Sequence, residues 1–162
     1  MSNNNLDNND IVYSVKNLNL WYGQEQALKD VDLEIDVSPP QGWLLEPDPA
    51  MIRSGGLREL AMELGASLID ETIAYMTCAD SVESPWVRRW QILDWMPFNL
   101  KKLRAYLRER DIGHITVKKR GSPITPEQLI KKLKLKGSQS CTLVLTQHHS
   151  VPIVIVCADY TS

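Results

Sequence analysis

The chain has 162 residues, of which 43% are hydrophobic and 23% are charged. This composition is typical of one globular domain, or of one domain with an appendage, and no apolar run is long enough to cross a bilayer. The first ten residues, MSNNNLDNND, lack the features of a secretory signal, so a cytoplasmic protein without a membrane segment is expected. Because Cys78, Cys141 and Cys157 show no C-x-x-C spacing, we expect small buried side chains rather than disulfides or a zinc site.

The net charge of −2 hides a strong asymmetry along the chain. Residues 97–137 contain 12 basic and 3 acidic side chains, a net charge of +9, whereas the remaining residues sum to −11. A basic segment of this kind indicates a polyanionic partner, although the solvated face of an ordinary helix also gathers lysines.

The N-terminal part predicts a β-hairpin. Residues 1–10 are expected to be disordered, and the strand-forming residues 11–22 and 27–37 enclose a turn at Tyr22-Gly23-Gln24. Residues 38–42, SPPQG, then predict a linker. The predicted organisation is therefore a hairpin over residues 11–37 and a domain over residues 43–160. An isolated hairpin is marginally stable, so we expect residues 1–40 to be dispensable for folding of the remainder.

Three helices are predicted in the second part from their capping residues. Asp48 before Pro49 can cap the first helix, and Asn99 can cap the second. Thr125 and Gln128 form a capping box at the start of the third. The helices are expected near residues 48–64, 99–111 and 125–136.

Strand-forming segments alternate with these helices. The predicted strands cover residues 73–77, 89–95, 114–119, 141–147 and 151–158. The order from residue 89 is β-α-β-α-β-β, which predicts an α+β or α/β sandwich with helices packed on a mixed sheet. Trp90 and Trp95 are separated by an odd number of residues, so they are expected on opposite faces of their strand.

The hairpin carries a resemblance to a known family. Residues 15–23, VKNLNLWYG, and residues 26–35, QALKDVDLEI, resemble the first hairpin of ATP-binding-cassette ATPases of the phosphate-importer kind. The resemblance implies that Tyr22 matches the aromatic residue that stacks on adenine. The phosphate loop G-x-x-x-x-G-K-[ST] does not follow, so Tyr22 is expected to be nonfunctional and no ATP hydrolysis is expected.

A longer resemblance spans residues 43–158. The matching stretches are LLEPDPA at 44–50, IAY at 73–75, MPFNLKKLR at 96–104, VKKRG at 117–121 and TLVLT at 142–146. They look like the THUMP-like domain at the C-terminus of bacterial class I S-adenosylmethionine-dependent methyltransferases. In that family a catalytic domain lies upstream, but no acidic-x-Gly-x-Gly loop for the cofactor occurs in this chain. We therefore expect no cofactor and no catalysis by the chain alone.

By analogy with true THUMP domains, this resemblance implies contact with RNA. The basic segment supplies the candidate residues, whose cations would displace counterions from the RNA backbone. The candidates are Lys101, Lys102, Arg104, Arg108, Lys118, Lys119, Arg120, Lys131, Lys132 and Lys134. The alternative is a basic face that is merely solvated.

Other candidate residues favour structural roles. His148 and His149 are adjacent at a strand end and diverge, which favours a solvated turn over a metal site. Glu46 and Asp48 could suggest acid-base chemistry, but Asp48 already caps a helix. Trp86 is the tryptophan most expected at the surface, where it could stack on a base.

The leading hypothesis is a noncatalytic, RNA-binding and substrate-presenting module of an S-adenosylmethionine-dependent methyltransferase. The alternatives are a methyltransferase fragment that is active only with a separate catalytic domain, a protein-interaction module whose hairpin adds to a partner's sheet, and a truncated ATP-binding subunit of a phosphate transporter.

Overall fold

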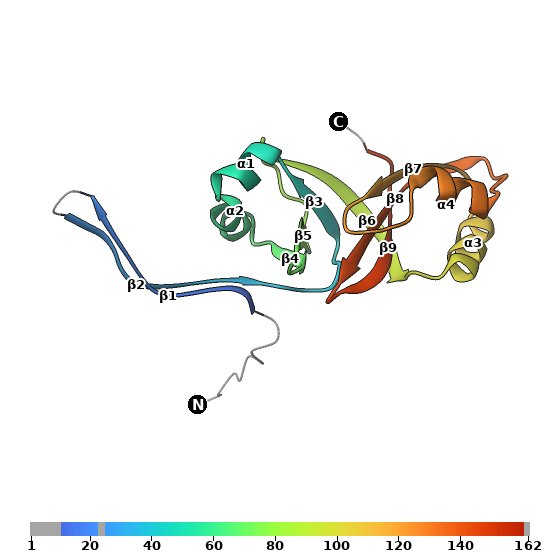
Figure 1. Cartoon of the computed structure of the whole chain (residues 1–162). Coiled ribbons are helices and arrows are strands. Elements are labelled where there is room, and N and C mark those ends of the chain that lie inside the picture. Colours follow the sequence, from blue (N-terminus) through green and yellow to red (C-terminus); the bar gives the residue numbers. More distant parts are fainter. Residues whose placement is uncertain (1–10, 23–24, 161–162) are drawn as a thin grey trace, which may run out of the picture.

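The computed structural model describes residues 11–22 and 25–160, with side chains from residue 35 onward. The expectations for residues 1–10, for the turn at residues 23–24 and for the Tyr22 side chain lie outside the described residues. β1 (Ile11–Tyr22) and β2 (Glu25–Asp36) pair antiparallel, as predicted. The end of this hairpin at Tyr22 and Glu25 extends away from the other elements, whereas its opposite end lies beside β4 (Ser67–Asp70) (Figure 1).

Within the described residues, seven further strands form one sheet in the order β4-β5-β3-β6-β9-β8-β7. They are β3 (Trp43–Pro47), β4 (Ser67–Asp70), β5 (Ile73–Cys78), β6 (Val87–Pro97), β7 (Ile112–Lys119), β8 (Gln139–His148) and β9 (Val151–Cys157). β7 and β8 are parallel, and all other neighbours are antiparallel. The predicted α+β fold with a mixed sheet is confirmed, whereas β3 and β4 were not expected.

β6 connects two halves of this sheet. Its first part, through Gln91, pairs with β3, and its second part, from Ile92 onward, pairs with β9. A register shift lies between Ile92 and Asp94, and such a bulge moves the following side chains to the other face. Trp90 and Trp95 consequently pack against the same hydrophobic cluster. The expectation that they lie on opposite faces is wrong.

In the part of the chain that the structure describes, four helices cover the outside of the sheet. They are α1 (Pro49–Ser54), α2 (Leu57–Leu64), α3 (Leu100–Glu109) and α4 (Pro126–Leu133). The single helix expected over residues 48–64 is divided because Gly55 adopts a left-handed φ of 76°, which ends a helix. α4 ends earlier than predicted because Lys134 adopts a left-handed conformation with φ 49°.

The capping residues are those that the sequence predicts. Asp48 accepts from the amide of Ala50, and Asn99 accepts from the amide of Lys102. Thr125 and Gln128 exchange the two hydrogen bonds of a capping box. Each bond satisfies an amide at a helix start that has no partner within the helix, so local sequence places these helices.

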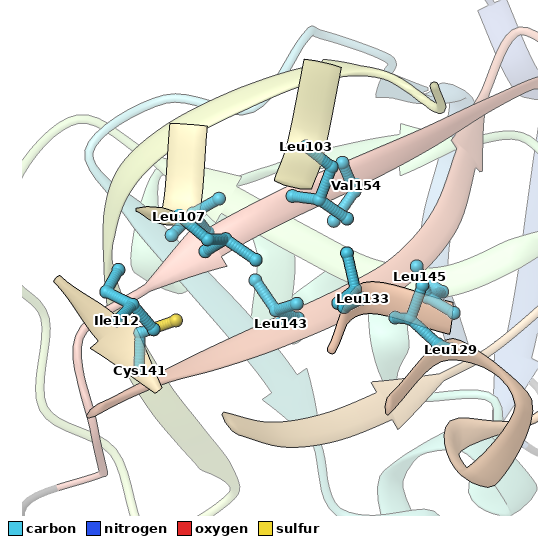
Figure 2. Packing of buried hydrophobic residues seen from close by; sticks show 10 residues of the cluster. Leu103, Leu107, Ile112, Leu129, Leu133, Cys141, Leu143, Leu145 and Val154 are labelled. Atoms are coloured by element: carbon cyan, nitrogen blue, oxygen red, sulfur yellow. The ribbon is translucent and has the colours of Figure 1, made fainter. Parts of the chain in front are cut away.

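The hydrophobic residues form three layers around the bent sheet. The inner cluster joins the two halves, since it contains Ile69 of β4 together with Val144 of β8. α1 and α2 cover a second cluster on the outside of β3–β5. α3 and α4 cover a third cluster on the outside of β7–β9, where Leu103 and Leu107 meet Leu143 (Figure 2). The sheet therefore holds two helix pairs on its outer faces.

The end of β2 belongs to the second cluster. Ile35 and Val37 are buried. Val37 forms a parallel bridge with Leu68, and the amide of Ser38 donates to the Leu68 carbonyl over 2.9 Å. Residues 35–38 therefore contribute to the packed core, and a truncation at residue 40 would remove three buried side chains, those of Ile35, Val37 and Pro40.

Candidate nucleic-acid interface

α3 and α4 together present a basic surface. Their buried leucines face the sheet, so the charged side chains at the intervening positions point outward. We call this surface the helical basic face, which consists of Lys101, Lys102, Arg104, Arg108, Lys131, Lys132 and Lys134. The Arg104 guanidinium donates to the carbonyl of Lys132 over 2.5 Å and so links the two helices.

The cations of the helical basic face are available to an anion. Among the described residues, the ion pairs of this region are confined to Arg110 with Glu109, and none includes a member of the face. A hollow of about 560 Å³ lies between the helices and is lined by Arg104, Lys131, Lys132 and Lys134. Four of the predicted site residues, Arg104, Lys131, Lys132 and Lys134, therefore line one hollow.

The three candidates outside the helical basic face divide between two surfaces. Lys119 is exposed. It lies two residues after Val117 on β7 and therefore on the same face of the strand, the face on which Val117 packs under α3 and α4. Lys118 instead points to the inner side, where its ammonium lies 2.7 Å from Glu46 Oε2. Arg120 lies 3.9 Å from Glu46 Oε1. Lys118 and Arg120 are thus not part of the helical basic face.

Glu46 is the centre of this inner arrangement, which we call the Glu46 cluster. Arg120 also donates to the carbonyl of Ala74 over 3.3 Å, and its guanidinium lies 4.8 Å from the centre of the Tyr75 ring. Burial, together with the nearby Glu46 carboxylate, raises the pKa of Tyr75 to about 12. The phenol is therefore protonated at neutral pH. The Glu46 cluster connects β3 and β5 with the end of β7, and so joins the two halves.

A groove lies beside the Glu46 cluster, where the two halves of the sheet meet. Its larger hollow, of about 500 Å³, is lined by Arg88, Trp90, His114, Ile115, Thr116, Lys118, Ser140, Cys141, Thr142, Asp159 and Tyr160. A second hollow of about 410 Å³ is lined by Glu46, Asp48, Trp86 and Arg120, among others. Arg88 and Lys118 line both hollows, so the two form one groove.

Sequence reasoning did not identify this groove. Its walls come from the start of β6, from β7, from the start of β8 and from the segment after β9. The alternation of Trp86, which directly precedes β6, with Arg88 and Trp90 on β6 is the local signal that could have indicated it. Trp86 is exposed as expected, and it lines the second hollow.

The turn between β8 and β9 is not simply solvated. His148 is half-buried and its Nδ1–H donates to the carbonyl of Ile69 over 2.6 Å. The His148 ring also meets Trp95 edge-on, with 6.3 Å between the ring centres. The expectation of a solvated turn is wrong for His148, because β4 covers it. Among the described residues, no group of three His, Cys, Asp or Glu side chains is placed to hold a metal ion.

The three cysteines are buried free thiols, as predicted. Burial raises the pKa of Cys141 to about 11 and that of Cys157 to about 12. Since the thiolate is the nucleophilic form, burial disfavours reaction of these side chains at neutral pH. They contribute to packing rather than to chemistry.

Comparison with known proteins supports the longer resemblance. Residues 87–159 match the family described as THUMP domain-like. An uncharacterised S-adenosylmethionine-dependent methyltransferase of Mycobacterium tuberculosis, in strains CDC 1551 / Oshkosh and ATCC 25618 / H37Rv, is 31% identical over 123 residues. The match covers 76% of this chain and 34% of the relative. The chain therefore spans about a third of the length of these relatives.

Two further similarities concern the fold and a short segment. A crystal structure from Porphyromonas gingivalis W83, described as a methyltransferase, has a TM-score of 0.57 at 17% identity and covers 92% of this chain and 38% of that chain. It shows the same fold. A stretch of 31 residues is 55% identical to the phosphate import ATP-binding protein PstB of Oceanobacillus iheyensis. This match covers 19% of this chain and 11% of PstB. None of the described helices combines the length and apolar character needed to cross a bilayer.

Proposed function

From the premise that residues 87–159 form a THUMP-like domain, we propose that the chain is a noncatalytic module that binds RNA for an S-adenosylmethionine-dependent methyltransferase. The observation that carries this proposal is the helical basic face. Its seven cations project from two helices that Arg104 links directly. RNA phosphates would bind there by displacing counterions, largely without regard to sequence.

The chain's own features support a binding role rather than catalysis. The buried thiols have raised pKa values, and the carboxylate of Glu46 is engaged by two cations. The module would position RNA, and the methyl transfer would occur in a separate catalytic domain. The β1–β2 hairpin, derived from a transporter ATPase in this proposal, would have no part in ATP hydrolysis.

RNA binding can be tested by fluorescence anisotropy with a labelled 20-nucleotide single-stranded RNA over a range of salt concentrations. The double variant Lys131→Gln/Lys132→Gln removes two exposed charges from the helical basic face. The matched control, Arg53→Gln/Arg58→Gln, removes the same charge from α1 and α2, which cover the outside of the other half of the sheet.

We expect the Lys131 and Lys132 variant to bind RNAs of unrelated sequence more weakly by a similar factor. The slope of the log-log salt dependence should fall by about 1.4, or 0.7 for each lost phosphate contact. The control should keep the wild-type slope. A folded Lys131 and Lys132 variant with unchanged RNA affinity at low salt would contradict the proposal and favour a merely solvated face.

A separate catalytic domain is the second proposed partner. The M. tuberculosis relatives extend far beyond the matched region, which is 34% of their length, so the rest of such a protein is the natural binding partner to test. Calorimetric titration of this chain with that separately produced region should detect a complex. Lack of heat at micromolar concentrations of both would contradict this part of the proposal.

A further inference from the structure

We propose that the groove between the two halves of the sheet holds one nucleotide of single-stranded RNA. In this arrangement the base stacks on Tyr160 and the phosphate lies beside Arg88 and Lys118. The inference rests on the proposed function, because it assigns a second contact for the same class of ligand. It differs from the helical basic face in that it depends on an aromatic ring as well as on charge.

The aromatic wall of the groove is built in two layers. Trp90 is only 6% exposed, and its ring centre lies 5.3 Å from that of Tyr160 with 48° between the planes. Tyr160 is 49% exposed. Buried Trp90 therefore packs against the Tyr160 ring, and about half of the Tyr160 surface remains exposed to solvent. Exposed aromatic faces of this kind stack on unpaired bases.

The cationic wall lies next to the aromatic one. Arg88 is exposed, and within the described residues its guanidinium has no hydrogen bond or ion pair. Because Arg88 and Trp90 are two residues apart on β6, they share a face and lie about 7 Å apart along the strand. Such a spacing suits a ligand with an aromatic ring at one end and an anion at the other.

Lys118 adds a second cation that is already held in place. Its ammonium contacts Glu46 Oε2 and also lies 4.3 Å from the centre of the Trp90 ring. In the second hollow, Arg88, Lys118 and Arg120 face the carboxylates of Glu46 and Asp48. Across the whole groove these three cations equal the three carboxylates, because Asp159 lines the larger hollow. Attraction of an incoming phosphate would therefore depend on Arg88, which forms no ion pair within the described residues.

Hydrogen-bonding groups complete the larger hollow. The Ser140 hydroxyl donates to Asp159 Oδ2, and Thr116 and His114 line the same wall. A carboxylate only accepts hydrogen bonds, so Asp159 favours a base with an exocyclic amino group, as in adenine, cytosine or guanine, over uracil. The hollow of about 500 Å³ has the size of a small-ligand pocket, which accommodates a nucleotide and not a duplex.

Four single variants of the full chain test the proposal. Tyr160→Ala removes the stacking ring, whereas Tyr160→Phe keeps it. Arg88→Gln removes the cation of the groove. Arg53→Gln is the matched control, since it removes the same charge from an exposed residue of α1 that lines neither hollow of the groove. The probes are AMP, inorganic phosphate and the 20-nucleotide RNA.

We expect Tyr160→Ala to weaken binding of AMP and of RNA at least about 5-fold, the lower end of what one stacked base contributes, without changing the salt slope. Tyr160→Phe should bind as the wild type does. Arg88→Gln should weaken both ligands and flatten the salt slope for RNA by about 0.7. Arg53→Gln should change neither affinity. Inorganic phosphate should compete with AMP only at much higher concentration.

The outcomes separate this proposal from the proposed function. If the Lys131 and Lys132 variant loses RNA affinity while Tyr160→Ala and Arg88→Gln do not, the groove proposal is overturned and the proposed function stands. If the wild type binds AMP, the variants change AMP affinity as expected, and no RNA is bound, the groove is a nucleotide site and the proposed function fails. Equal competition by phosphate and AMP would overturn the stacking role of Tyr160.

Discussion

The backbone amide of Ser150, in the turn between β8 and β9, donates a hydrogen bond of 3.1 Å to Asp70 Oδ2 at the end of β4. Gln147 of β8 donates to Oδ1 of the same carboxylate over 3.2 Å, as does the amide of Thr72 over 2.9 Å. Asp70 is 1% exposed. The two halves of the sheet are thus joined by buried polar contacts at Asp70 and by the Glu46 cluster.

Acid should weaken the Asp70 contacts. Burial raises the pKa of Asp70, but hydrogen bonds from Thr72, Ser150 and Gln147 outweigh it and hold the pKa below the ordinary value of 3.8. A carboxyl group whose pKa is lowered by folding stabilises the fold above its unfolded pKa, and this contribution is lost as pH falls through the folded pKa. The free energy of unfolding from urea titrations should therefore decrease below about pH 4.

Asp70→Asn should be about 1–3 kcal/mol less stable than the wild type at pH 7, because an amide is a weaker acceptor and leaves buried donors poorly satisfied. It should also lose part of the acid dependence. Exposed Asp48→Asn is the matched control, since asparagine caps helices as well as aspartate does. Equal loss of stability on acidification in Asp70→Asn and wild type would show that other groups cause it.

Glu46→Gln should separate stability from ligand binding. It leaves Lys118 and Arg120 without their carboxylate, so we expect a loss of about 1–3 kcal/mol in urea unfolding. Removing a negative charge from the groove should at the same time strengthen AMP binding. Glu83→Gln breaks an exposed pair with Arg89 and should cost less than about 1 kcal/mol. Weaker AMP binding in a folded Glu46→Gln protein would contradict the expected electrostatic effect.

Local signals explain what the sequence predicts well. Asp48, Asn99 and Thr125 satisfy amides within their own helix starts, so their neighbours in sequence suffice to identify them. The β-α-β-α-β-β order from residue 89 follows from similarly local patterns. The left-handed turn at Gly55 is also a local property, but a continuous apolar stripe from α1 to α2 concealed it.

Contacts between distant residues explain what the sequence does not predict. The bulge after Ile92 arises where β6 changes its partner from β3 to β9, and neither partner is evident from the β6 sequence. The direction of the Lys118 side chain is likewise not evident from its local sequence, because the alternation of residues along β7 does not show which face of the strand is the inner one. Its partner Glu46 lies 72 residues earlier, and only the folded sheet brings the two together.

The core under α3 is expected to be sensitive to truncation of a single side chain. Leu107 has no exposed surface and packs between α3 and the sheet. Leu107→Ala should reduce the free energy of unfolding by about 2–5 kcal/mol, because burial is lost and a cavity remains. Ile130→Ala on α4 is a control, since Ile130 is 47% exposed and should change stability by about 0.5 kcal/mol or less.

Gly113 and Gly137 approach each other at the start of the β7–β8 pair. A Cβ at Gly113 would lie 1.8 Å from the carbonyl oxygen of Gly137, so the two backbones would have to separate. Gly113→Ala should therefore prevent folding or cost more than about 4 kcal/mol. Gly65→Ala meets no atom within 4 Å and is strained only by its φ of 59°, so about 1 kcal/mol is expected. Similar thermal midpoints for both variants would contradict the close approach.

The boundary between the hairpin and the domain can be located by two truncations. Removal of residues 1–34 leaves Ile35 and Val37, which are 7% and 8% exposed and pack in the cluster under α2. Removal of residues 1–40 takes both away, together with the hydrogen bond from Ser38 to Leu68. Each of these apolar side chains contributes about 1.5–3 kcal/mol by its burial.

We therefore expect the protein lacking residues 1–34 to unfold in urea close to the wild-type midpoint. The protein lacking residues 1–40 should be less stable by about 3 kcal/mol or more, or should aggregate because Leu68 and its neighbours become exposed. The full-length double variant Ile35→Ala/Val37→Ala is the control for chain length, and it should reproduce most of that loss. Equal stability of the two truncated proteins would place the domain boundary after residue 40, since residues 35–38 would then contribute nothing to the core.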